Sequence, residues 1–161
     1  MNYDKKNTKT YTYDEALLRM MKYCAYQERC HLEVEQKLNE MRMIPLAKEK
    51  IILQLMQDNF LNEERFAKAF VRGKFLIKKW GRKKIEQHLQ LKQISSFNKK
   101  TAFQEIDQEQ YYKHLKEWAL KKSKQLGKLS YANQQKLYAF LYSKGYESEL
   151  ISEVINELKQ G

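Results

Sequence analysis

The chain has 161 residues, of which 42% are hydrophobic and 32% charged, and its formal net charge is +11. With one proline and five glycines, it lacks the turn residues of a hairpin-rich fold and favours helices. No stretch approaches the roughly 20 apolar residues that span a bilayer, and the N-terminus has no signal-peptide pattern. We therefore expect a cytoplasmic protein with no membrane association, whose Cys24 and Cys30 stay reduced and partly buried.

Positive charge is concentrated in the middle of the chain. Residues 1–61 hold 10 Lys and Arg against 9 Asp and Glu, whereas residues 62–107 hold 12 against 5. Residues 108–161 hold 9 against 6. An uneven positive charge of this kind predicts a polyanionic partner for the middle third.

Apolar residues recur at offsets of 51 and then 52 residues, which indicates three copies of one helical unit. Within each copy they follow the spacing of a buried helical stripe. The aligned positions include Ala16, Ala67 and Ala119 in a first helix, Leu38, Leu89 and Leu141 in a second, and Ile51, Ala102 and Val154 in a third. We predict an all-α fold of three tandem three-helix repeats that form an elongated, curved body. The expected boundaries are 12–61, 62–107 and 108–161, with residues 1–11 as a flexible N-terminal tail.

Residues with capping chemistry stand at the expected helix ends. Thr12 and Glu15 form a possible capping box, and Asn62 is a good N-cap. Pro45, Ser96 and Ser148 share one repeat position, where the third helix of each copy should begin with proline in a first turn or serine as a cap. Gly81 is expected in the turn between two helices, and Gly145 is a natural residue to follow a helix C-terminus.

One segment, residues 65–84, carries nine basic residues and no acidic one. Ordinary exposed helix faces interleave Glu with Lys, so we interpret this unrelieved charge as a phosphate-binding surface. Phe66, Phe70 and Ile77 are expected on the opposite, core face. The predicted binding residues, with Trp80 as a possible stacking platform, are Arg65, Lys68, Arg72, Lys74, Lys78, Lys79, Trp80, Arg82, Lys83 and Lys84. A second group, Lys121, Lys122, Lys124 and Lys128, either binds nucleic acid or complements a helix dipole.

Signatures of catalysis and of metal binding are absent from the sequence. It contains no glycine-rich phosphate loop, and His31, His88 and His114 lack ligand-like partners at metal spacing. No nucleophile is paired with a base. We therefore expect no enzyme activity, no catalytic residue, no metal and no cofactor.

The basic segment and its neighbours resemble the RecX regulatory proteins. The resemblance rests on NEERFAKAFVRGK (62–74), KWGRKKIEQHL (79–89), KQI (92–94) and HLEVEQKL (31–38), and it covers residues 14–159. It implies a monomer that binds the RecA filament on single-stranded DNA, and duplex DNA only weakly. Such proteins damp strand exchange and ATP hydrolysis in DNA repair, recombination and the SOS response. The resemblance assigns this role to Arg65, Arg72, Lys74, Lys79, Arg82 and Lys83.

Two positions depart from the family pattern, and two other functions stay open. Cys30 replaces a serine N-cap, and Gln93 replaces the glycine of K-G-I. One alternative is a helix-turn-helix DNA-binding regulator that does not act on RecA, although a run of lysines favours phosphate contact over base reading. The other is a structural repeat adaptor whose charge only aids solubility.

Overall fold

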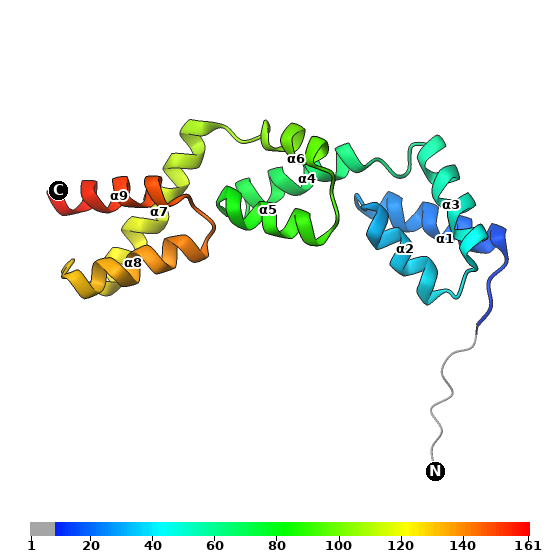
Figure 1. Cartoon of the computed structure of the whole chain (residues 1–161), viewed down its shortest axis with the longest axis horizontal. Coiled ribbons are helices and arrows are strands. Elements are labelled where there is room, and N and C mark those ends of the chain that lie inside the picture. Colours follow the sequence, from blue (N-terminus) through cyan, green and yellow to red (C-terminus); the bar gives the residue numbers. More distant parts are fainter. Residues whose placement is uncertain (1–8) are drawn as a thin grey trace, which may run out of the picture. The chain divides into compact units, whose positions relative to one another are not determined.

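The computed structural model describes residues 9–161, and these form nine helices with no strand between them (Figure 1). The helices are α1 (Tyr13–Tyr26), α2 (His31–Glu40), α3 (Pro45–Gln57), α4 (Glu63–Leu76), α5 (Arg82–Leu91), α6 (Ser96–Phe103), α7 (Gln108–Leu126), α8 (Tyr131–Ser143) and α9 (Ser148–Gln160). The all-α class and the three-by-three helix repeat are confirmed. Within residues 9–161, no helix is long and apolar enough to cross a membrane.

The chain divides into two compact units, residues 1–66 and 67–161, and the division falls inside α4. Unit 1 therefore contains α1 to α3, and unit 2 contains most of α4 together with α5 to α9. The elongated, curved shape and the repeat boundaries at residues 62 and 108 stay predictions. The predicted tail lies, for residues 1–8, outside the described residues, whereas Tyr11 packs against the core of unit 1.

The core of unit 1 is built from the apolar stripes of its three helices. It consists of Ala16, Met20, Cys24, Val34, Leu38, Met41, Ile51, Leu55 and Leu61. The predicted capping box closes α1, since the backbone N–H of Glu15 donates to Thr12 and the N–H of Thr12 donates to Glu15. Both cysteines are buried thiols. As the sequence indicated, Cys30 provides no side-chain cap for α2.

The second helix of each repeat ends in the same turn. The residue after the C-cap adopts a positive φ in all three copies: 58° at Arg42, 59° at Gln93 and 97° at Gly145. The next backbone N–H then reaches back to the helix, as in the donation of Ile94 to Leu89 at 3.1 Å, which is the pattern of a Schellman motif. Gly145 thus takes its predicted place, and Gln93 forms the turn without the glycine of the family pattern.

Some details of the expected helix ends were wrong. The third helices do begin at Pro45, Ser96 and Ser148, but neither Ser96 nor Ser148 is the cap. The cap of α6 is Ser95, whose hydroxyl accepts from the backbone N–H of Asn98, and that of α9 is Glu147, which makes no side-chain cap hydrogen bond. Ile77 is 78% exposed instead of buried, because α4 ends one residue earlier, at Leu76.

Within unit 2, the second and third repeats meet through two glycines. The backbone N–H of Gly81 donates to the carbonyl of Lys144 at 2.7 Å, and the N–H of Lys83 donates to the carbonyl of Gly145 at 2.9 Å. A Cβ atom on Gly81 would overlap the backbone of Gly145 and Tyr146. Only glycine allows this approach, which places the start of α5 against the end of α8.

Buried and partly buried aromatic residues complete the contact between these repeats. The carbonyl of Lys79 accepts two hydrogen bonds, from the indole of Trp118 at 2.8 Å and from the hydroxyl of Tyr146 at 2.7 Å. The hydroxyl of Tyr111 accepts from the backbone N–H of Arg82 and donates to Glu147. Burial raises the pKa of Tyr111 and Tyr146 far above the ordinary range, so both hydroxyls stay protonated donors.

Candidate nucleic-acid interface

The structure separates the predicted basic residues into two groups by what each side chain contacts. Four of them form ion pairs with carboxylates from distant elements. These pairs are Arg65 with Glu28, Arg72 with Glu105, Lys79 with Glu117, and Arg82 with Glu147. The absence of acidic residues within 65–84 therefore does not leave the charge unrelieved, because tertiary contacts supply the carboxylates.

Arg65 and Arg82 are further occupied by contacts within the fold. Arg65 donates to the side chain and carbonyl of Asn59 and to the carbonyl of Phe60, which holds the connection between α3 and α4. The backbone N–H of Arg65 is in turn capped by Asn62, as predicted. The guanidinium of Arg82 lies 4.0 Å from the ring centroid of Tyr111. These two arginines serve primarily to organise the fold.

The second group consists of lysines that pack on aromatic rings. The ammonium groups of Lys74 and Lys84 lie 4.8 Å and 4.4 Å from the ring centroid of Trp80, whose ring also contacts His88 at 4.6 Å. Lys83 lies 5.3 Å from the ring of Tyr142. Trp80 is half-buried under these groups, so it positions cations more than it offers an open face to a base.

The pKa of His88, which contacts Trp80, reflects the positive charge around this ring. Burial, followed by the charges of Lys74, Lys84 and Lys92, holds the pKa of His88 below its ordinary value. The imidazole therefore stays neutral at neutral pH, and the positive charge of the site comes from lysines.

Of the remaining predicted residues, Lys78 is exposed beyond the end of α4, and Lys68 is partly buried on α4.

A matching cluster on the third repeat continues this arrangement. The ammonium of Lys144 lies 4.2 Å from the ring of Trp118 and 5.4 Å from that of Phe140, and Lys122 lies 4.9 Å from Phe140. Burial, followed by the charges of Lys84 and Lys121, lowers the pKa of Lys144. Lys84 thus acts electrostatically on both clusters, which are joined where Gly81 meets Gly145.

Two shallow hollows of about 180 Å³ follow this line across unit 2. One is lined by residues that include Lys83, Lys84 and Tyr142, and the other by residues that include Trp118, Lys122 and Lys144. We call this surface the cationic–aromatic strip and define it as Lys74, Trp80, Lys83, Lys84, Trp118, Lys121, Lys122, Phe140, Tyr142 and Lys144. Cations held on aromatic rings beside these hollows suit the backbone phosphates of a nucleic acid.

Four of the ten residues of this strip, Lys74, Trp80, Lys83 and Lys84, are among the binding residues predicted from the sequence. Trp118, Phe140, Tyr142 and Lys144 were not among the predicted binding residues, because their place beside Lys84 depends on the contact between Gly81 and Gly145. Lys121 and Lys122, which the sequence left open between nucleic acid and helix dipole, lie in the hollow with Trp118. The positive charge of the whole chain belongs to unit 2: residues 67–161 hold 20 Lys and Arg against 9 Asp and Glu, whereas residues 1–66 hold 11 basic and 11 acidic residues.

Two family models match the two repeats that carry this strip. The model described as the second three-helix domain of RecX matches residues 62–98, and that of the third matches residues 108–155, which together exceed half of the chain. The chain belongs to the RecX family. Regulatory protein RecX of Lactobacillus johnsonii is 28% identical over 144 residues, and that of Bacillus cytotoxicus 26% over 147. These matches cover 89% and 91% of this chain but 53% and 54% of the relatives, so the chain spans about half their length.

Solved RecX structures share the fold. The crystal structure of RecX from Lactobacillus salivarius superposes with a TM-score of 0.82 at 24% identity, covering 92% of this chain and 97% of that one. A second RecX crystal structure gives a TM-score of 0.81 at 24% identity, covering 89% of this chain and 71% of that one.

Within residues 9–161, no cluster of three or more His, Cys, Asp or Glu could hold a metal ion.

Proposed function

We propose that this RecX-family chain binds the RecA filament on single-stranded DNA and restrains its ATP hydrolysis and strand exchange, without catalysing a reaction itself. Membership of the RecX family supports the choice of RecA as partner. The cationic–aromatic strip is the observation that carries the mechanism, because it supplies phosphate contacts on a rigid surface while using few groups that read bases. In this mechanism the chain acts in the cytoplasm as a monomer and needs no cofactor.

The division of charges guides the choice of contact residues. Reversing Arg72 or Lys79 would set a glutamate against Glu105 or Glu117, which confuses a loss of binding with a loss of stability. Lys84 and Lys144 have no such carboxylate within 4 Å among residues 9–161, and both face aromatic rings along the strip. We therefore assign them, with Lys74, Lys83 and Lys122, the main contact with DNA phosphate.

The test is RecA-dependent ATP hydrolysis on single-stranded DNA, titrated with this protein at two salt concentrations. The double variant Lys84→Glu, Lys144→Glu should require at least about tenfold more protein for half-inhibition, since each 1.4 kcal/mol is tenfold in affinity. Lys100→Glu, Lys159→Glu is the matched control, because both lysines are exposed and lie outside the strip. Circular dichroism and urea unfolding must show that both variants fold.

The outcomes separate the candidate functions. Inhibition that weakens with salt and is lost in the strip variant alone supports the proposal. Equal inhibition by both variants would remove the strip from the mechanism. Absence of any effect on RecA, together with tight binding to one duplex sequence, would favour the helix-turn-helix alternative. Binding that is insensitive to salt would favour the structural adaptor.

A further inference from the structure

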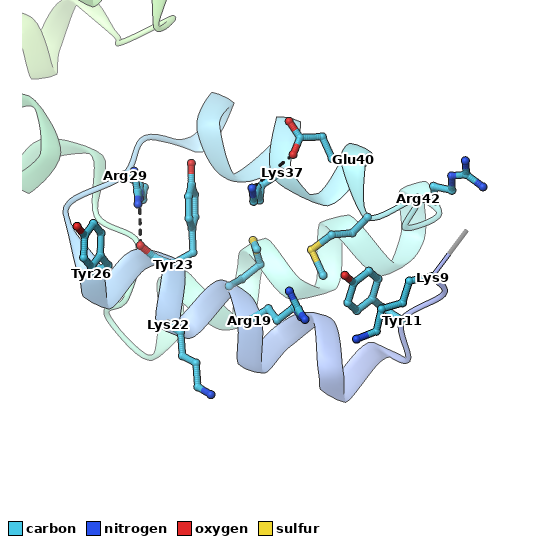
Figure 2. Close-up of a pocket in the computed structure, with 12 residues that line it drawn as sticks. Lys9, Tyr11, Arg19, Lys22, Tyr23, Tyr26, Arg29, Lys37, Glu40 and Arg42 are labelled. Atoms are coloured by element: carbon cyan, nitrogen blue, oxygen red, sulfur yellow. Dashed lines mark hydrogen bonds and ion pairs between the residues drawn. The ribbon is translucent and has the colours of Figure 1, made fainter. Parts of the chain in front are cut away.

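Unit 1 contains a basic pocket that its neutral composition conceals. A hollow of about 660 Å³ lies between α1 and the end of α2 (Figure 2). Six basic residues and one acidic residue line it, together with three tyrosines and two methionines. They are Lys9, Tyr11, Arg19, Met20, Lys22, Tyr23, Tyr26, Arg29, Lys37, Glu40, Met41 and Arg42. Six of the eleven basic residues of residues 1–66 thus meet at one place, where one of the eleven acidic residues accompanies them.

Aromatic rings hold two guanidinium groups of this pocket in position. Arg29 lies 3.7 Å from the ring centroid of Tyr23 and donates its Nε–H to the carbonyl of that residue at 3.0 Å. Arg19 lies 4.9 Å from the ring centroid of Tyr11. Figure 2 shows these two arrangements at opposite ends of the hollow, with Lys9 beside Tyr11. Arg29 also pairs with Glu33 at 3.9 Å, so it organises the wall of the pocket. The guanidinium of Arg19, held over a ring, is a preorganised donor for phosphate oxygens.

The other cations leave the pocket short of negative charge. Glu40 pairs with Lys37 at 3.5 Å and is the acidic residue of the lining. Among residues 9–161, no carboxylate lies within 4 Å of the charged groups of Lys9, Arg19, Lys22 or Arg42. A concave surface with this excess of positive charge concentrates an anionic ligand.

The tyrosines indicate which anion fits. Tyr26 is 84% exposed at the edge of the hollow, so its ring is open to a stacking partner. An acidic peptide would use the cations but would have no need of open aromatic rings, whereas an unpaired base stacks on them. The volume falls within the range of sites for small molecules, about 300–1,000 Å³, which holds a nucleotide and excludes a duplex.

We propose that this pocket binds a short segment of single-stranded nucleic acid, with a phosphate on Arg19 and a base stacked on Tyr26. The pocket is a second contact, on unit 1, in addition to the cationic–aromatic strip on unit 2. The inference takes its ligand from the proposed function, but it requires DNA alone and no RecA.

The test uses the full chain and a fluorescent oligothymidine, with affinity measured by anisotropy at several salt concentrations. Arg19→Glu should weaken binding about fivefold or more and reduce the dependence on salt. Lys50→Glu is its control, since it makes the same charge change on an exposed residue of unit 1 outside the pocket. Tyr26→Ala should also weaken binding about fivefold or more, whereas Tyr26→Phe should not. Tyr131→Ala removes a ring that is 78% exposed on unit 2 and should have no effect.

A second measurement locates the strand. An oligonucleotide that carries 5-iodouracil should crosslink under ultraviolet light to the tryptic peptide of residues 23–29, which contains Tyr23 and Tyr26. Crosslinks confined to residues 67–161, with affinity lost only in Lys84→Glu, Lys144→Glu, would overturn the pocket and leave the strip. Loss of affinity only in the pocket variants would sustain the pocket and overturn the strip. The remaining outcome is that polyglutamate displaces the oligothymidine with an affinity equal to that of the oligothymidine itself and unchanged by Tyr26→Ala. That result would make the pocket a peptide site and overturn the inference.

Discussion

Replacing Gly81 by alanine tests whether the contact between two glycines joins the second and third repeats. The added Cβ would overlap the backbone of Gly145 and Tyr146, which no side-chain rotation can relieve. Overpacking a close contact costs about 1–3 kcal/mol. Separation of the two backbone segments would also lose two hydrogen bonds, those of Gly81 with Lys144 and of Lys83 with Gly145, each worth about 0.5–1.5 kcal/mol. We therefore expect Gly81→Ala to lower the free energy of unfolding of unit 2 by about 2–6 kcal/mol.

A loss of this size is a large part of the stability of an ordinary domain, about 5–15 kcal/mol. Urea unfolding followed by tryptophan fluorescence measures it directly. Gly73→Ala is the matched control, because the added Cβ in the middle of α4 would meet no atom within 4 Å beyond its chain neighbours and the backbone of its own helix. It should stabilise the protein by up to about 1 kcal/mol through helix propensity. A Gly81→Ala protein within about 0.5 kcal/mol of the parent, the range of a neutral surface substitution, would refute the reasoning.

Three further predictions concern single residues. Gln93→Gly should stabilise the protein to urea by about 0.5–1 kcal/mol, because Gln93 has a φ of 59°, whereas Gln90→Gly within α5 should destabilise it by about as much. Burial and the charge of Lys79 lower the pKa of His114, so the unfolded state binds the proton more readily and the free energy of unfolding should fall as pH drops below about 6.5. His114→Gln should flatten that urea–pH profile relative to the parent. Burial raises the pKa of Cys24 to about 11, so its thiol should react with a disulfide reagent in urea-unfolded protein but hardly in native protein.

Most of the fold could be predicted from the sequence because the repeat is written in short-range patterns. The start of α3 at Pro45 follows from proline in a first turn, and that of α9 at Ser148 from the spacing of core residues; both starts were correct, although Ser148 is not the cap. The errors arose where a local pattern ran on past a helix end. Ile77 continues the apolar stripe of α4, yet the helix has already ended at Leu76, which leaves its side chain exposed.

The binding surfaces were harder to predict, because they depend on residues far apart in the chain. The partners of Arg72 and Arg82 lie 33 and 65 residues away, so sequence could not show that their charges are paired. Lys144 joins Lys84 only through the contact between Gly81 and Gly145. The pocket of unit 1 was missed for another reason, since averaging the charge over residues 1–61 hides a local excess of cations.

The position of the two tryptophans gives the chain a built-in means of observing its halves separately. Trp80 and Trp118 both lie in unit 2 around the carbonyl of Lys79, whereas unit 1 contains tyrosine but no tryptophan. Fluorescence excited at the red edge of the absorption band, where only tryptophan absorbs, therefore reports on the junction of the second and third repeats alone. Far-ultraviolet circular dichroism reports on all helices together. If unit 1 unfolds independently, the two signals will change at different urea concentrations. Single-stranded nucleic acid bound only in the pocket of unit 1 will then raise the urea midpoint of the dichroism change that belongs to unit 1. The urea midpoint of tryptophan fluorescence will stay fixed.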